Sequence, residues 1–214
     1  MTKPLLQMAL DASDLTSALT SVEPVADLLD VIEVGTILAF AHGLDSVEVL
    51  RHTYPNHTLV CDMKVTDASA ILTQLAMAAG ADWVTVSAAA HRETIRAAKQ
   101  VTDACHGDVQ IELYGHWTLD DARAWVDMGI TQAIYHRSRD AELAGINWTQ
   151  DDLDKMHHLS DLGIELSITG GIVPDDLHLF KPLSVKAFIA GRALAGHTGR
   201  KVAESFREEI GKHW

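Results

Sequence analysis

Four ionisable residues interrupt stretches of the sequence that are otherwise apolar. These residues are Glu33, Lys64, Glu112 and His136. A buried charge is costly unless it is paired with an opposite charge or bound to a metal. We therefore expect these side chains to belong to one functional site rather than to the apolar core.

The carboxylates are candidate ligands for a divalent cation. Glu33 and Asp62 supply carboxylate oxygens, and Glu112 supplies a further one. Such oxygens, together with water, are the ligands that Mg²⁺ prefers. The alternative is that these acids pair with Lys64 and Arg139 and bind no metal.

Lys64 follows Asp62 by two residues, which places both side chains on one face of a strand. A lysine among carboxylates stays protonated and can stabilise an oxyanion. The alternative is an ion pair that serves only the structure.

Two glycine-containing segments are candidates for phosphate binding. Thr169-Gly170-Gly171 and Ala190-Gly191-Arg192 each follow an apolar run and lead towards a helical stretch. Backbone N–H groups in such loops bind phosphate, and an arginine can complete the site. Glycine pairs also serve ordinary turns, but the position of the segments and Arg192 favour an anion site.

Residues 136–140, His-Arg-Ser-Arg-Asp, add further titratable and cationic groups. His136 is a candidate acid near pH 7, and Arg139 is a candidate for holding a carboxylate or orienting a water. The alternative is a surface loop with a charged tip, an interpretation that suits Arg137 better than His136.

The elements that must position these residues follow from an alternation of two patterns. Short apolar runs, typical of strands buried on both faces, alternate with amphipathic stretches of helical periodicity. The clearest helical stretches are 14–29, 67–79, 118–128, 149–162 and 199–210. The strands are predicted over 5–10, 31–34, 58–61, 83–86, 109–113, 132–135, 165–168 and 187–189.

This alternation predicts a single-domain (β/α)8 TIM barrel over residues 1–214, because strands that alternate with helices form right-handed, parallel βαβ units. An open doubly wound sheet is the alternative. It would carry a glycine fingerprint after the first strand, where this sequence has Asp11-Ala12-Ser13. In a TIM barrel the active site lies at the C-terminal ends of the strands. The predicted strands bring to that face Asp11, Glu33, Asp62, Lys64, Ser87, Glu112, His136, Thr169 and Arg192.

The composition excludes several classes of protein. The 214 residues carry a formal net charge of −13, which disfavours binding to nucleic acid. No apolar run approaches the roughly 20 residues of a membrane helix, and we expect no membrane partner. The N-terminal residues lack the apolar stretch of a signal peptide, and the two cysteines form no CxxC pair. We therefore expect a cytoplasmic location.

Residues 62–67, Asp-Met-Lys-Val-Thr-Asp, form a D-x-K-x-x-D motif at the end of the third predicted strand. This motif resembles the signature of the orotidine monophosphate decarboxylase suprafamily. That group includes a metal-free nucleotide decarboxylase, the metal-dependent 3-keto-L-gulonate 6-phosphate decarboxylases and the 3-hexulose 6-phosphate synthases. The segment 136–140 is similar to the sugar-phosphate decarboxylases rather than to the synthases. Further similar segments are 32–36, 82–86, 107–113, 169–171 and 188–192.

The resemblance implies decarboxylation of 3-keto-L-gulonate 6-phosphate to L-xylulose 5-phosphate and CO₂ through a Mg²⁺-stabilised enediolate, in L-ascorbate degradation. It implies Mg²⁺ ligands at Glu33 and Asp62, and stabilisation of the enediolate by Lys64. His136 and Arg139 would deliver a proton through water.

The resemblance also implies a homodimer, in which Asp67 reaches into the neighbouring subunit's active site. Asp11 and Glu112 would contact substrate or position Lys64. Phosphate contacts are implied for Thr169, Gly171, Gly191 and Arg192, with Gly170 in the same loop. Met63 departs from the small residue expected between Asp62 and Lys64, and strand alternation predicts that it points away from the site.

Two alternative functions remain open at this point. One is 3-hexulose 6-phosphate synthase activity, an aldol addition of formaldehyde to ribulose 5-phosphate. The other is a non-catalytic barrel that binds sugar phosphates, which would need the glycine loops but not Glu33, Asp62 and Lys64.

Overall fold

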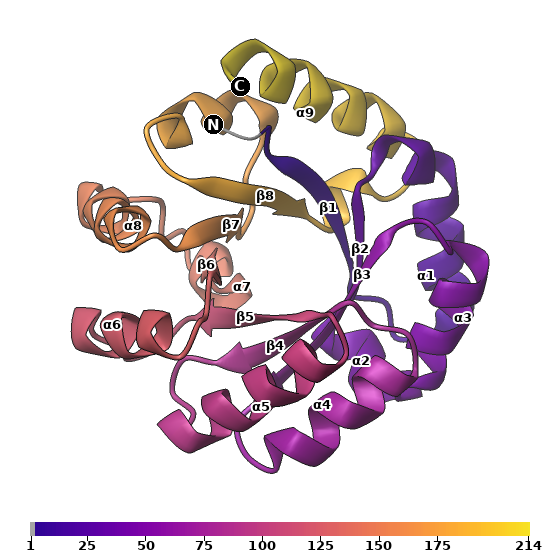
Figure 1. Cartoon of the computed structure of the whole chain (residues 1–214). Helices are drawn as coiled ribbons and strands as arrows, with labels where there is room; N and C mark the ends of the chain where they lie inside the picture. Colours follow the sequence, from indigo (N-terminus) through magenta and orange to yellow (C-terminus); the bar gives the residue numbers. More distant parts are fainter. Residues whose placement is uncertain (1–2) are drawn as a thin grey trace.

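Eight parallel strands close into a barrel, with β1 to β8 in sequence order and β8 paired to β1 (Figure 1). The computed structural model describes residues 3–214, apart from the side chains of residues 141 and 142. Helices surround the strands, so the predicted (β/α)8 barrel is confirmed.

The strands lie close to their predicted positions. They are β1 (Leu5–Leu10), β2 (Val31–Val34), β3 (Thr58–Val65), β4 (Trp83–Ser87), β5 (Asp108–Leu113), β6 (Gln132–His136), β7 (Glu165–Thr169) and β8 (Val185–Ala190). The helices are α1 (Leu15–Val22), α2 (Thr36–His42), α3 (Asp45–Thr53), α4 (Ser69–Ala78), α5 (Arg92–Ala104), α6 (Leu119–Asp127), α7 (Arg139–Leu143), α8 (Gln150–Asp161) and α9 (Gly199–His213).

Two elements differ from their predictions. The helix predicted over 14–29 is split into α1 and a 3₁₀ helix over Glu23–Leu28. Pro24 lies at the start of the second piece, and it has no N–H with which to continue an α-helix. The third strand continues four residues beyond its predicted end at Cys61, so that Asp62 and Lys64 lie within β3 itself.

Side chains alternate between two environments along the strands. On β1, Leu6 and Met8 belong to the main apolar cluster, which also contains helix residues such as Ala18 and Ile95. Gln7, between them, is fully buried and bonds to a side chain of β2. The apolar core thus lies between strands and helices, while polar side chains occupy part of the barrel interior.

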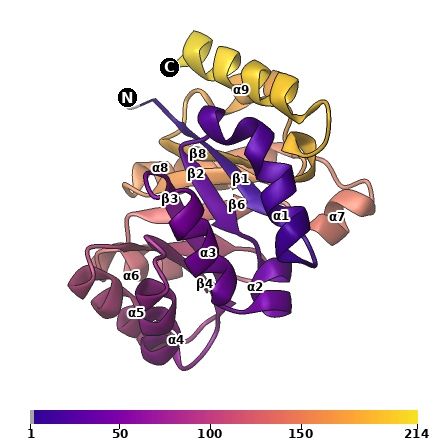
Figure 2. The same ribbon diagram turned by 90° about the vertical axis from the view of Figure 1, so that its right-hand side faces the viewer.

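The views from two sides show how the chain ends and the helix after β6 are placed. The N-terminal strand β1 and helix α9 lie at the same side of the barrel (Figures 1 and 2). The short helix α7 projects from the rest of the molecule in Figure 2. Within residues 3–214, no helix combines the length and the apolar character that crossing a membrane requires.

Candidate active site

A cavity of about 630 Å³ lies at the C-terminal ends of the strands. The predicted site residues that line it are Asp11, Glu33, Asp62, Lys64, Glu112, His136, Arg139, Thr169, Gly170, Gly171, Gly191 and Arg192. Asp67 does not line the cavity. It is exposed in the turn between β3 and α4, where its carboxylate accepts the Ala68 N–H at 2.8 Å.

The ammonium group of Lys64 lies at the centre of a cluster of polar side chains. It donates to Thr36 Oγ1 at 2.7 Å, contacts the Asp62 carboxylate closely and lies 3.3 Å from Glu112 Oε1. Burial acts to lower the pKa of Lys64, but the charges of Glu112 and Asp62 outweigh it and raise that pKa above its usual value. Lys64 is therefore a fixed positive charge in the cavity.

A bulge in β3 places Lys64. The pairing of β3 with β4 shifts register between Cys61 and Val65, and Lys64 has a φ of 46°. Left-handed backbone at a residue other than glycine is uncommon and concentrates at functional sites. The sequence predicted from simple strand alternation that Lys64 lies beside Asp62. The bulge breaks that alternation, but both side chains do line the cavity.

Two threonines hold the bulge and the Asp62 carboxylate together. Thr85 Oγ1 accepts the Lys64 N–H at 2.9 Å and donates to Asp62 Oδ1 at 2.6 Å. Thr36 Oγ1 donates to Asp62 Oδ2 at 2.6 Å. Both carboxylate oxygens of Asp62 are thereby oriented. Neither Thr36 nor Thr85 was among the predicted site residues, although the polar Thr85 interrupts the apolar run of β4 and was an available signal.

Glu33 lies beside this cluster without a cation of its own. It is only 6% exposed, and within the described part of the chain it forms no ion pair within 4 Å. Gln7 Nε2 donates to its Oε2 at 2.5 Å. Burial, followed by the charges of Asp62 and Glu112, raises the pKa of Glu33 well above its usual value, although Lys64 and Gln7 act in the opposite direction.

Glu112 joins Lys64 to the histidine at the end of β6. Its Oε1 lies 2.7 Å from His136 Nδ1 and also contacts the lysine. Its Oε2 is buried and has no hydrogen-bond partner among the described residues. Further out, Arg139 Nη2 pairs with Asp11 Oδ2 at 3.0 Å. Of the pairings that the sequence left open as an alternative, those of Lys64 with Asp62 and Glu112 exist, whereas Arg139 pairs with Asp11 instead of these acids. They leave Glu33 without an ion pair and one oxygen of Glu112 without a partner among the described residues.

The donor set fits a divalent cation that keeps water ligands. No group of three or more His, Cys, Asp or Glu side chains in the described part of the chain is arranged as a complete metal site. Mg²⁺ is usually held by one or two carboxylates plus water and substrate, rather than by a full protein cage. Glu33 and Asp62 supply two carboxylates at the cavity. With Glu112 they make three buried carboxylates, and Lys64 carries the only ammonium group that lines the cavity in the described structure. The excess negative charge and the orphaned Glu112 oxygen suit an added cation.

The glycine loop after β7 also lines the cavity. Gly170 and Gly171 have φ values of 104° and 66°, a conformation that favours glycine. A Cβ atom at Gly170 would lie 2.2 Å from the Arg137 carbonyl oxygen, so no larger residue fits there. Gly191 and Arg192 line the same cavity from the end of β8.

Comparison with known proteins assigns the family. The family described as "Orotidine 5'-phosphate decarboxylase / HUMPS family" matches residues 4–206. The chain belongs to this family. A Haemophilus influenzae protein named "Probable 3-keto-L-gulonate-6-phosphate decarboxylase" is 53% identical, and the match covers 100% of both chains.

Solved structures of family members agree with this assignment. The crystal structure of 3-keto-L-gulonate-6-phosphate decarboxylase from Vibrio cholerae is 64% identical, with a TM-score of 0.96 over the whole of both chains. The structure of KGPDC from Streptococcus mutans in complex with a sugar phosphate is 41% identical, with a TM-score of 0.96 and complete coverage of both chains. The resemblance that the motifs predicted is thus confirmed, as is membership of a family of enzymes.

Proposed function

We propose that this family member removes CO₂ from 3-keto-L-gulonate 6-phosphate and releases L-xylulose 5-phosphate. The observation that carries the proposal is the cavity itself, which is lined both by a half-buried lysine among carboxylates and by two glycine-containing loops suited to phosphate. The names of the relatives from H. influenzae and V. cholerae support this choice of substrate.

Substrate binding in this proposal begins at the phosphate. Thr169, Gly170 and Gly171, together with Gly191 and Arg192, line one part of the cavity and would bind the phosphate group. That group is remote from the bond that breaks, so its binding energy serves to orient the β-keto acid.

The reaction needs a place for the electron pair left when the C–C bond to CO₂ breaks. The pair moves towards the keto oxygen, and the Lys64 ammonium group stabilises the resulting oxyanion. Because Asp62, Glu112 and Thr36 hold this ammonium group before the reaction, little reorganisation is needed as charge develops.

A proton must then reach the carbon that lost CO₂. His136 is suited to deliver it through a water, since its ring lines the cavity and Glu112 fixes its Nδ1 side at 2.7 Å. Arg139, held by Asp11, would orient that water.

Glu33 and Asp62 would hold Mg²⁺ in this proposal. Bound there, the cation would act as a Lewis acid and stabilise negative charge that develops on the substrate oxygens. Gln7 and the two threonines keep these carboxylates directed at the cavity.

We also propose a homodimer in which Asp67 reaches the partner's site. Apolar side chains are exposed on the helices that follow β2 and β3: Phe40 is 82% exposed on α2, and Ile71 is 67% and Leu75 50% exposed on α4. Exposed apolar side chains of this kind favour contact with a second protein surface. Asp67 lies two residues before the start of α4 and is exposed.

The proposal is tested by measuring CO₂ release from 3-keto-L-gulonate 6-phosphate by the purified chain. We expect release together with formation of L-xylulose 5-phosphate. Formaldehyde-dependent consumption of ribulose 5-phosphate, without CO₂ release, would identify a synthase instead. A barrel that only binds sugar phosphates would show neither. A role in L-ascorbate degradation and a cytoplasmic location remain predictions.

A further inference from the structure

The side chain of Arg137 ties together two loops at the mouth of the barrel. Its Nε donates to the Gly170 carbonyl oxygen at 2.8 Å. Its Nη1 lies 3.4 Å from the Ile146 carbonyl oxygen and 3.5 Å from Asn147 Oδ1. The guanidinium carbon lies 5.2 Å from the centre of the Trp148 ring, in cation–π geometry. Arg137, which the sequence left open as a charged surface tip, is half-buried and held by these contacts.

The backbone of Arg137 itself also contacts the glycine loop. The Arg137 N–H donates to the Thr169 carbonyl oxygen at 3.2 Å, which continues the pairing of β6 with β7. The Arg137 carbonyl oxygen occupies the space that a Cβ at Gly170 would need. The end of β6 and the glycine loop are thus fitted to each other through one residue.

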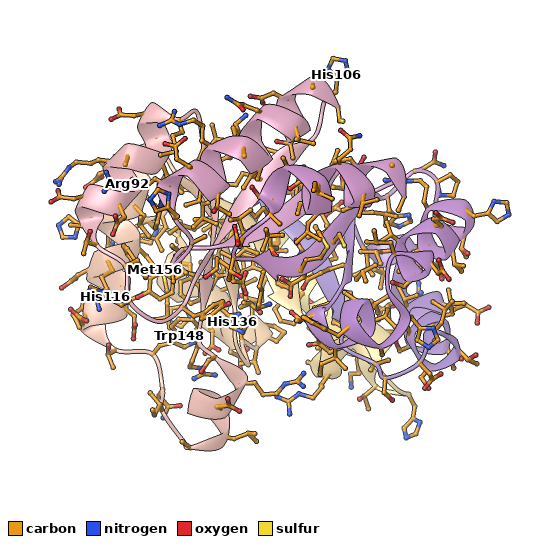
Figure 3. All side chains as sticks on the ribbon, turned by 90° about the horizontal axis from the view of Figure 1, so that it is seen from below. Arg92, His106, His116, His136, Trp148 and Met156 are labelled. Carbon is orange, nitrogen blue, oxygen red and sulfur yellow. The ribbon has the colours of Figure 1, made fainter. Side chains whose placement is uncertain are left out.

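Arg137 also stands between two cavities. A second cavity of about 290 Å³ lies beside the first, lined by Trp117, Tyr135 and Trp148 among others. His136 and Arg137 line both. Figure 3 shows the labelled His136 and Trp148 on the side of the molecule from which α7 projects. Arg137 therefore forms part of the wall between the two cavities, next to His136.

We infer that Arg137 is a positioning residue that keeps the Gly170–Gly171 loop in register with the segment carrying His136 and Arg139. The inference rests on the proposed function, in which the loop binds phosphate and the segment delivers the proton. The guanidinium acts through the protein, because the donors at Nε and Nη1 are directed at carbonyl and amide oxygens of the two loops. A lysine keeps the charge but cannot reproduce the forked contacts.

The test compares inorganic phosphate binding in four proteins by titration calorimetry: the wild type, Arg137→Lys, Gly170→Ala and the double variant. We expect each single change to weaken phosphate binding about tenfold. The double variant should be no worse than either single one, because both changes disrupt the same junction. Arg123→Lys is the matched control, because Arg123 is exposed on α6 and pairs only with Asp120 in the described structure. This control variant should bind phosphate like the wild type.

The values of KM and kcat distinguish a positioning role from a simple loss of stability. Arg137→Lys should raise KM and also lower kcat, because both the phosphate loop and His136 are displaced, while calorimetric unfolding confirms a folded protein. If Arg137→Lys binds phosphate as tightly as the wild type, the inference is overturned. It is also overturned if the double variant loses phosphate affinity by the product of the two single losses. If Gly170→Ala does not fold, the comparison of Arg137→Lys with Arg123→Lys carries the test. The titrations need no turnover, so their result is separate from that of the CO₂ assay.

Discussion

The ammonium group of Lys64 is held between the carboxylates of Asp62 and Glu112 before any substrate binds. Replacing it by methionine removes the only ammonium group that lines the cavity in the described structure. We expect Lys64→Met to lower kcat/KM for CO₂ release by at least about 100-fold, since it removes the charge that stabilises the oxyanion. Phosphate binding should change little.

Lys186→Met is a matched control for this substitution. Lys186 also pairs with a glutamate, Glu165, at 3.0 Å, but it does not line the cavity. It should retain near wild-type turnover. Equal losses in both variants would contradict a specific role for Lys64.

The raised pKa of Glu33 predicts a pH-dependent stability in the presence of EDTA. Burial and the neighbouring Asp62 and Glu112 disfavour its charged form, so the folded protein keeps a proton that the unfolded chain has released. Stability should therefore fall as pH rises from about 4.5 towards the raised pKa, by at most about 1.4 kcal/mol per pH unit.

Urea unfolding of Glu33→Gln and wild type at pH 5 and pH 8 measures this effect. The variant should gain stability relative to the wild type at the higher pH. Glu208→Gln on the exposed surface of α9 controls for the loss of a carboxylate. A difference between Glu33→Gln and the wild type that does not change with pH would contradict the predicted shift.

Among the elements of the barrel, β4 contributes to the bulge in β3 through the Thr85 hydroxyl group, which bonds to both Lys64 N–H and Asp62 Oδ1. Thr85→Val keeps the side-chain shape but leaves the Lys64 N–H and Asp62 Oδ1 without their shared partner. We expect a loss of about 1–3 kcal/mol in the free energy of unfolding, together with a lower kcat, measured by urea denaturation and CO₂ release.

Thr73→Val on α4 separates this effect from a simple change of residue type. Thr73 is also fully buried, but its hydroxyl has no partner among the described residues. The change should leave stability nearly unchanged or slightly raised. Similar losses at both threonines would show that the bulge does not depend on Thr85 specifically.

The strands and most of the cavity could be predicted because parallel barrel strands are buried on both faces and read as apolar runs. Glu33, Glu112 and His136 stood out as interruptions of those runs. The left-handed backbone at Lys64 could not be predicted, since only the shift between β3 and β4 creates it. Nor could the role of Arg137, because its partners Gly170 and Ile146 are set by the packing of two loops.

At the scale of the whole molecule, the exposed apolar surface of α2 and α4 should mediate association of two copies. We expect Phe40→Asp to convert a dimer into monomers in sedimentation velocity, because it places a charge in the proposed contact. CO₂ release should fall with it, since Asp67 would no longer reach the partner's site.

Leu143→Asp is the matched control for the dimer prediction. Leu143 is 71% exposed on α7, which projects at a different part of the molecule (Figure 2). This variant should sediment like the wild type. A wild-type monomer with full activity would contradict the proposed sharing of active sites.

We propose that Glu33, Asp62 and Lys64 together form a metal-assisted decarboxylation site. Its most direct test is CO₂ release from 3-keto-L-gulonate 6-phosphate after treatment with EDTA and after Mg²⁺ is restored, in the wild type and in Glu33→Gln. We predict that EDTA abolishes release and that Mg²⁺ restores it in the wild type but not in the variant. Release that persists in EDTA, or that Glu33→Gln supports as well as the wild type, would contradict the claim.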